Sequence, residues 1–373
     1  MPTLCTSLVP PRFGGSSLAP ISKHPSITRS GFSAPLSARS FVGRIASVIA
    51  ATLLALNSTA AEVPPFFKGV TVSCQTWGIE WQTPEMAATL EELKSLGANS
   101  FAIHPYARIT NDGHVQYRIR DENRHITVPL DWARERRMSA MLIPHIAYWN
   151  SQFKWRGDIK FERAEEWERF FTDYEAWIVE MARLAEAHGA AVFSVGLEYT
   201  HAQKFEARWR QIIRSVRAVY SGKVTYGANW NDYTEVKFWD ALDYIGVLAY
   251  FPLSTARNPG AAELAAAWNK RSAELAGFSR DHGGKQFLFV EVGYNEGART
   301  AAEPWSFETG GKNATSIQER CIESALSLTD KHPFLAGMFF WKWFPELPDD
   351  DEENFRIQTP AIKALFAKYW KAK

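Results

Sequence analysis

The sequence predicts a single (β/α)8 barrel, and three observations support this fold class. Eight short apolar segments alternate with segments of helical periodicity, as expected for parallel strands that are buried on both faces. About 310 residues follow an unusual N-terminal segment, and this length is typical of one barrel domain. No linker and no short repeat is evident in the sequence after residue 62, so a second folded domain is not indicated.

The predicted strands are short and rich in Val, Ile, Phe and Leu. In chain order they cover Gly69–Cys74, Ser100–His104, Ser139–His145, Ala191–Leu197, Lys223–Ala228, Tyr244–Tyr250, Gln286–Glu291 and Gly337–Trp341. In barrels of this kind the chemistry takes place at the C-terminal ends of the strands. The residues at these ends are therefore the first candidates for function.

Helical periodicity fills the segments between the predicted strands. The clearest helix spans 163–188, where apolar residues from Trp167 to Leu184 recur at spacings of three and four and Gly189 supplies a stop. A second helix is expected at 203–220 for the same reason. The other predicted helices cover 84–96, 126–137, 262–281, 315–330 and 360–370.

The N-terminal segment differs from the rest of the chain in charge and pattern. Residues 1–61 contain five basic residues and no Asp or Glu. The basic residues Arg39 and Arg44 precede an apolar run at 45–56, and small residues then lead to Ala61. This order predicts a cleavable presequence at 1–61 and a catalytic domain at 62–373, secreted or periplasmic, with organellar import as the alternative. The apolar run of 12 residues is shorter than the roughly 20 that a membrane-spanning helix needs.

The composition disfavours several classes of function. A net charge of +1 gives no sign of a nucleic-acid-binding surface. The three cysteines form no CxxC or Cys/His spacing, so a zinc finger or a disulfide framework is not indicated. No Gly-rich phosphate loop follows the last two predicted strands. The 15 tryptophans exceed what a core usually needs, and they favour a protein that stacks aromatic rings on sugars.

Two carboxylates lie at predicted strand ends, Glu198 after the fourth strand and Glu291 at the end of the seventh. A carboxylate in such an apolar setting is costly to desolvate unless it has a partner or a function. Each could belong to a structural ion pair, but two on opposite sides of one barrel favour glycoside hydrolysis. In the retaining form of that reaction one carboxyl group protonates the leaving oxygen and the other attacks the anomeric carbon. Their tasks need opposite protonation states at the same pH, so their environments must separate their pKa values.

The chain resembles the clan A (β/α)8 glycosidases, and more narrowly glycoside hydrolase family 113, the β-mannanase family. The segments that carry this resemblance are Pro144–Ile146, Trp155–Gly157, Val195–Glu198, Ala228–Trp230, Phe238–Gly246, Ala249–Leu253, Val290–Tyr294 and Phe340–Trp343. The resemblance covers essentially all of 66–345, in order. It implies a retaining, endo-β-1,4-mannanase-like hydrolase, with Glu198 as the general acid/base and Glu291 as the nucleophile. The substrate would be a β-linked polysaccharide or oligosaccharide.

One departure from the clan A pattern affects the sugar preference. Many of these enzymes carry Asn immediately before the acid/base residue, where its amide can bond the sugar 2-hydroxyl, and this chain has Leu197 there. Family 113 also lacks that Asn. Asn229 is the candidate for the missing role, because an amide side chain both donates and accepts.

Further residues near the strand ends are predicted to contact substrate: His145, Trp155, Asn229, Trp230, Tyr250, Tyr294, Trp341 and Trp343. Trp341 and Trp343 are two residues apart, so in an extended segment they should face the same way as a sugar platform. Tyr250 and Tyr294 could donate a hydrogen bond to the nucleophile or to a sugar hydroxyl.

His145 is expected to bond a sugar hydroxyl or to orient Glu198. The alternative for His104, His145 and His201 is a metal site, and a metal-dependent barrel hydrolase therefore stays open, although no HxH or HExxH pair occurs. A non-catalytic carbohydrate-binding barrel is the other alternative. Neither a metal nor a cofactor is expected, because carboxylates and water supply the chemistry of glycoside hydrolysis. The sequence gives no indication of the oligomeric state.

Overall fold

The computed structural model describes residues 63–118, 121–347 and 355–371. All of them belong to one compact unit that extends from Ser58 to Lys373. The predicted presequence at 1–61, with its apolar run at 45–56, lies outside the described residues, as does the acidic run Asp349–Glu353.

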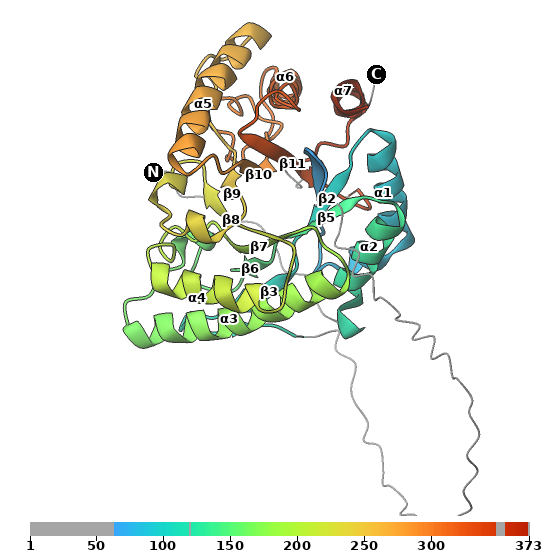
Figure 1. Cartoon of the computed structure of the whole chain (residues 1–373). Coiled ribbons are helices and arrows are strands. Elements are labelled where there is room, and N and C mark those ends of the chain that lie inside the picture. Colours follow the sequence, from blue (N-terminus) through green and yellow to red (C-terminus); the bar gives the residue numbers. More distant parts are fainter. Residues whose placement is uncertain (1–62, 119–120, 348–354, 372–373) are drawn as a thin grey trace, which may run out of the picture. The chain divides into compact units, whose positions relative to one another are not determined.

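Eight parallel strands close into a barrel, which confirms the predicted fold class (Figure 1). Each strand is buried along almost its whole length, which explains its continuous apolar sequence. Around the barrel, the strands follow the order of the chain and are β1 (Phe67–Val72), β2 (Ser100–Ile103), β5 (Ser139–Leu142), β7 (Val192–Leu197), β8 (Lys223–Asn229), β9 (Ile245–Leu248), β10 (Phe287–Val292) and β11 (Leu335–Trp343).

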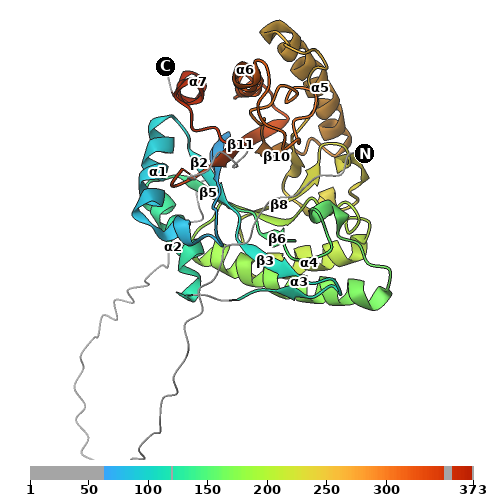
Figure 2. The ribbon, with the colours of Figure 1, turned by 180° about the vertical axis from the view of Figure 1, so that it is seen from behind.

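Helices surround the barrel on its outside, as the views from opposite sides show (Figures 1 and 2). They are α1 (Pro84–Ser95), α2 (Arg124–Glu135), α3 (Ala164–Ala187), α4 (Glu206–Arg217), α5 (Ala261–Asp281), α6 (Ala314–Leu326) and α7 (Pro360–Trp370). Between β8 and β9 the chain makes only two 3₁₀ turns, at Tyr233–Glu235 and Trp239–Ala241. This connection is therefore the one β-to-β crossover among the described residues where an α-helix is replaced by shorter turns.

The third predicted strand is divided in the structure. It ends as β5 at Leu142, and after Pro144 the chain continues as β6 (His145–Ala147) in a different sheet. Proline cannot donate to a ladder hydrogen bond, so a strand is readily interrupted there. The second sheet has the order β4–β3–β6, with β3 at Tyr106–Ile109 and β4 at Val115–Gln116. This small sheet was not predicted from the sequence. Its strands β3 and β6 directly follow β2 and β5 in the chain, and β6 positions His145.

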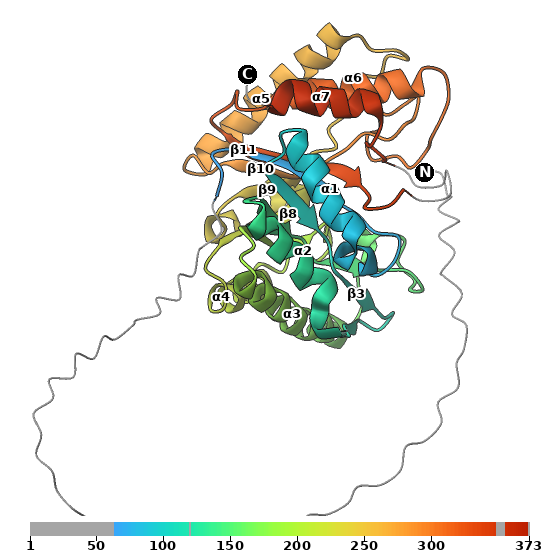
Figure 3. The same cartoon turned by 90° about the vertical axis from the view of Figure 1, so that its right-hand side faces the viewer.

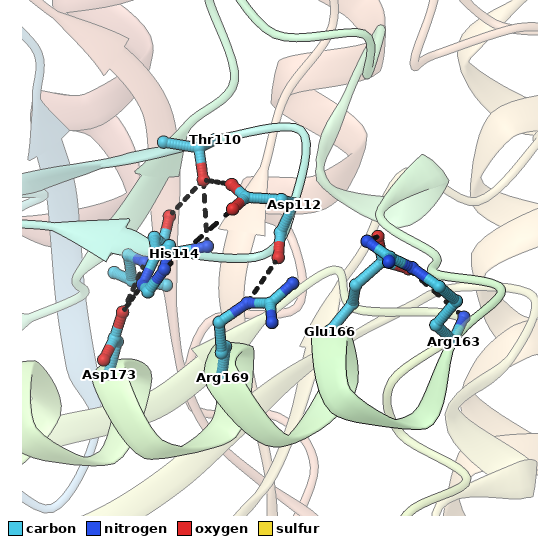
Figure 4. A network of polar contacts seen from close by, with 8 residues as sticks. Thr110, Asp112, His114, Arg163, Glu166, Arg169 and Asp173 are labelled. Atoms are coloured by element: carbon cyan, nitrogen blue, oxygen red, sulfur yellow. Dashed lines mark hydrogen bonds and ion pairs between the residues drawn. The ribbon is translucent and has the colours of Figure 1, made fainter.

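A network of polar contacts fastens the β3–β4 hairpin to α3 (Figure 4). Asp173 of α3 lies 2.8 Å from His114 Nδ1, and Arg169 of the same helix donates to the Asp112 carbonyl at 3.0 Å. Gly113 in the turn has φ +95°, and a Cβ there would lie 2.5 Å from the carbonyl oxygen of Glu166 in α3. The close approach of the hairpin to the helix therefore requires glycine.

Two buried apolar clusters make up the core. One fills the barrel and takes its members from the strands and the segments beside them, including Leu197 and Leu248. The other lies between the strands and the helices and includes Trp209 of α4 and Trp268 of α5. Leu197, which stands where many clan A enzymes have Asn, is fully buried in the barrel interior.

The last helix closes the outer layer beside the first. Lys363 of α7 places its Nζ 2.5 Å from Glu92 Oε1 of α1, and the two helices lie next to one another in Figure 3. In the part of the chain that the structure describes, no helix combines the length and the apolar character that crossing a membrane requires.

Candidate active site

The barrel brings Glu198 and Glu291 to the same end, as the sequence predicts. Glu198 directly follows β7, the fourth barrel strand, and Glu291 is the penultimate residue of β10, the seventh. All neighbouring strands are parallel, so their C-terminal ends meet at one end of the barrel. The two side chains are close enough for the charge of Glu198 to act on the ionisation of Glu291.

Glu291 is buried, with 4% of its surface exposed. The Tyr250 hydroxyl donates to its Oε2 at 2.9 Å, and His145 Nε2 lies 3.8 Å from its Oε1. Burial, together with the negative charge of Glu198, raises the pKa of Glu291 to about 8, although Arg156, Tyr250 and Lys342 act in the opposite direction. Both effects favour the protonated form of this carboxyl group in the free protein. Oε1 is buried and accepts no hydrogen bond from the described groups.

Glu198 is held by a guanidinium group. Arg156 places Nε 3.0 Å and Nη2 2.9 Å from the same carboxylate oxygen, Oε2. Glu198 itself has φ +63°, a left-handed conformation that residues other than glycine rarely adopt. Its backbone N–H donates to the Gly227 carbonyl at 2.8 Å, which ties the end of β7 to β8. Unusual backbone geometry of this kind collects at functional sites.

Two histidines and a tryptophan form a ring stack beside Glu291. The rings of His104 and His145 are 4.8 Å apart and nearly parallel, and Trp341 lies 6.0 Å from His145 and 5.1 Å from His104. Burial lowers the pKa of both histidines well below the usual value, so both imidazoles are neutral. The structure thus places His145 beside Glu291, and contact of His145 with a sugar hydroxyl or with Glu198 stays a prediction.

Tyr250 and Asn229 have different hydrogen-bond partners. Tyr250 makes the hydrogen bond to Glu291 that the sequence suggests. The Asn229 amide group donates to Thr200 Oγ1 at 3.1 Å and more weakly to Asp232 Oδ2 at 3.4 Å. Both partners are internal, so a contact between Asn229 and a ligand is left to its carbonyl oxygen. Contact with a sugar 2-hydroxyl stays a prediction.

Two of the predicted substrate residues point away from this site. Trp343 is completely buried in the apolar cluster between the strands and the helices, here called the outer cluster, and Lys363 Nζ of α7 lies 5.3 Å from its ring. Trp341, in contrast, packs against the barrel interior. The two tryptophans do not share a face because the β1–β11 register is irregular at this point, and consecutive β1 residues pair with Trp341 and Trp343. Tyr294 is also buried in the outer cluster, because it is three residues from Glu291 and side chains alternate along an extended segment.

Further aromatic side chains lie at the exposed rim. Trp155 is 38% exposed, and Trp230, directly after β8, stacks on Trp305 at 5.2 Å. Trp305 is 44% exposed and was not singled out from the sequence. Its loop is fixed by Asn295, whose amide donates to the carbonyls of Ser306 and Glu308. Asn295 thus organises the segment around Trp305.

Arg156 and His104 are the functional candidates that the sequence left without a role in the reaction. Arg156 was noted only as part of the Trp-Arg-Gly segment, and His104 only as a possible metal ligand. In the structure the neighbours of His104 are aromatic and imidazole rings. Among the described residues no three His, Cys, Asp or Glu side chains gather in a way that could hold a metal ion. Both residues lie at or beyond strand ends, so their positions alone make them candidates for function. The sequence does not indicate which residues they contact.

The chain is similar to known proteins along most of its length. Residues 70–357 match the profile of Glycoside Hydrolase Family 113. A β-mannanase of that family from Alicyclobacillus acidocaldarius, solved in complex with ManMIm, is 26% identical, with a TM-score of 0.70 over 82% of this chain and 97% of that one.

Other solved structures share the fold at lower identity. A family 113 β-1,4-mannanase is 22% identical, with a TM-score of 0.72 over 83% of this chain and 100% of its own. A β-glucuronidase from Ruminococcus gnavus is 16% identical, with a TM-score of 0.54 over 83% of this chain and 50% of its own. No curated protein matches the chain. The profile match spans most of the sequence and includes both carboxylates, so the chain is a glycosidase and belongs to glycoside hydrolase family 113.

Proposed function

We propose that this glycosidase hydrolyses β-linked mannan chains, with an endo mode of action and with retention of configuration. The observation that carries the proposal is the position of two carboxyl groups at the same end of the barrel. Glu198 is paired with a guanidinium group, and Glu291 is buried beside a tyrosine hydroxyl. Family membership and the 26% identical β-mannanase support mannan as the substrate.

The reaction proceeds in two displacements. The Glu291 carboxylate attacks the anomeric carbon as the glycosidic C–O bond breaks, and Glu198 gives its proton to the leaving oxygen. Glu198, now a carboxylate, then takes a proton from water, and the water oxygen displaces Glu291 from the glycosyl ester. Two inversions return the β configuration, and the protonation states of both groups are restored.

A glycan panel tests this proposal. The protein is incubated with β-mannan, β-glucan and xylan, with and without EDTA, and the first product is followed by ¹H NMR before mutarotation. We expect mannan to be cleaved fastest, with the β anomer appearing first and no effect of the chelator. An α anomer as first product would contradict retention. Loss of turnover with EDTA would favour the metal-dependent alternative, and binding without turnover would favour a carbohydrate-binding barrel.

The acid limb of the pH profile should lie at an unusually high pH. Glu291 attacks only as a carboxylate, and burial raises its pKa; the charge of Glu198 adds to this rise only while Glu198 is ionised. The value of kcat/KM reports ionisation in the free enzyme, so it should fall as the pH is lowered through this raised pKa. Initial rates on a soluble mannooligosaccharide between pH 4 and 10 check this. A limb near the ordinary value for Glu of 4.5 would contradict the assignment.

Removing the Tyr250 hydroxyl should weaken the nucleophile. Tyr250→Phe deletes the hydrogen bond to Glu291 Oε2, which lowers the pKa of that carboxyl group in the intact protein. We expect kcat/KM to fall about 10-fold and its acid limb to move to higher pH. Tyr220→Phe is the matched control, because that hydroxyl is also buried but donates to the Ala190 carbonyl away from the site. Equal effects of the two variants would show that Tyr250 acts only through packing.

A further inference from the structure

Arg156 pairs with Glu198, and its charge also acts on Glu291. It begins a 3₁₀ turn, Arg156–Asp158, in the loop after β6, and its side chain is 14% exposed. Its Nε and Nη2 groups approach Glu198 at 3.0 and 2.9 Å. Both contacts are to Oε2, so the guanidinium leaves Oε1 to other partners.

The asymmetry of this contact selects one oxygen for proton transfer. The Arg156 Nε–H donates to Glu198 Oε2 and Nη2 lies 2.9 Å from the same oxygen, so a proton on that oxygen would face a positive charge. The proton that Glu198 donates must therefore sit on Oε1. A lysine could supply the charge but not two donors in a fixed plane, because its ammonium group is a single point on a flexible stem.

The local sequence holds Arg156 in place. A Cβ at Gly157 would lie 2.1 Å from the Trp155 ring, so the indole packs directly on the glycine backbone. On the other side, the Arg156 guanidinium lies 5.9 Å from the Tyr148 ring. The Trp-Arg-Gly segment thus forms a compact turn, in which the residues flanking Arg156 determine where its guanidinium lies.

The same cation acts on Glu291. The groups that influence or face the Glu291 carboxyl are Glu198 beyond β7, Arg156 in the turn, Tyr250 beyond β9, Lys342 of β11 and His145 of β6. Of these, Glu198 raises the pKa of Glu291, whereas Arg156, Tyr250 and Lys342 lower it. His145 is neutral because burial lowers its own pKa. Arg156 therefore favours the ionised state that nucleophilic attack requires.

We propose that Arg156 is a positioning residue, which makes Oε1 of Glu198 the oxygen that exchanges the catalytic proton. The proposal rests on the function proposed above. In the first step the Oε1 proton passes to the leaving oxygen as the glycosidic bond breaks. In the second step Oε1 takes a proton from the attacking water.

Two substitutions separate these effects. Arg156→Lys keeps the charge and loses the paired donors, whereas Arg156→Gln loses both. Each is assayed for kcat/KM on a mannooligosaccharide, whose leaving group needs a proton, and on a 2,4-dinitrophenyl β-mannoside, whose leaving group does not. For Arg156→Lys we expect about 100-fold loss on the oligosaccharide, less than about 10-fold on the dinitrophenyl substrate and an unmoved acid limb. For Arg156→Gln we expect the same split and an acid limb at higher pH.

Arg210→Lys in α4 is the matched control. Arg210 also pairs with carboxylates, placing Nε 2.7 Å from Glu206 and Nη2 2.8 Å from Asp240, but it lies outside the site. We expect both substrates to be hydrolysed at the unmodified rate. Equal losses on the two substrates in Arg156→Lys, with thermal melting confirming that the variant is folded, would reduce Arg156 to a structural role and overturn the proposal. The proposed function fails separately, if the unmodified enzyme does not cleave β-mannans with retention.

Discussion

Replacing Glu291 by alanine or glutamine should abolish hydrolysis, lowering kcat/KM by about 10⁴-fold or more. Without this carboxylate the glycosyl ester cannot form, and the other carboxyl group of the site is held by Arg156. Initial rates on mannooligosaccharides measure the loss. Added azide or formate should restore part of the turnover in Glu291→Ala, because a small nucleophile can enter the vacated space, and the first product then has inverted configuration.

Melting temperatures at two pH values check that the Glu291 variants are folded, because the direction of the expected change is known. The pKa of Glu291 is raised in the folded protein, so its contribution to stability is fully present below the ordinary value of 4.5 and is lost as the pH rises through about 8. Glu291→Gln cannot ionise and should therefore melt at a higher temperature than the unmodified protein at pH 9, with a smaller difference at pH 5. Glu296→Gln, in the loop after β10, is the control and should keep full activity. Substantial residual hydrolysis by a folded Glu291 variant would refute its role.

Replacing Glu198 should give a loss that depends on the leaving group. Glu198→Ala removes the acid that protonates the departing oxygen, a contribution of about 10²–10⁴-fold. We expect a loss of this size in kcat/KM on mannooligosaccharides, whereas the 2,4-dinitrophenyl β-mannoside should react with Glu291 almost normally. The glycosyl ester should then accumulate, because the base that activates water is also missing, and stopped-flow absorbance should show a burst of dinitrophenol.

Azide distinguishes the role of Glu198 from that of Glu291. It needs no base, so it should accelerate turnover of the dinitrophenyl substrate by Glu198→Ala and give a β-glycosyl azide. An α-glycosyl azide from this variant would mean that the two roles are reversed. The same loss on both substrates, with no burst, would show that Glu198 is not the acid.

The barrel was predictable because the same alternation of apolar strand and amphipathic helix is repeated along the chain. Each strand is buried on both faces, so its apolar run is continuous and short, and the helices between carry an apolar stripe. The small sheet was not predictable in the same way. β4 has two residues and β6 has three, which is too few for any periodicity. Its stability comes from contacts such as His114 with Asp173, which are remote in sequence.

The candidate site was predictable in part. Position at a strand end was sufficient to select Glu198, Glu291 and Tyr250, because the fold alone brings strand ends together. Alternation along a strand gave the wrong side for Trp343, since the register of β11 against β1 is irregular there. A loop residue such as Arg156 has no periodic pattern, and its partner is decided by how the loop after β6 folds over β7.

The ionisation of Glu291 also depends on features that the sequence does not display. Retaining chemistry requires an ionised nucleophile, but the structure buries this carboxyl group and places a second carboxylate near it, and both raise its pKa. Arg156, Tyr250 and Lys342 act against this effect, and they come from three separate segments of the chain. We therefore expect the balance between these groups to determine the pH range of the activity.

Covalent trapping tests the central claim most directly. A 2-deoxy-2-fluoro-β-mannosyl fluoride has a reactive leaving group, and its fluorine slows hydrolysis of the glycosyl ester. After incubation, the intact protein should gain the mass of one fluorosugar, and peptide mapping should place that mass on Glu291. Attachment to Glu198 or to any other residue, or inactivation without a covalent adduct, would contradict the account.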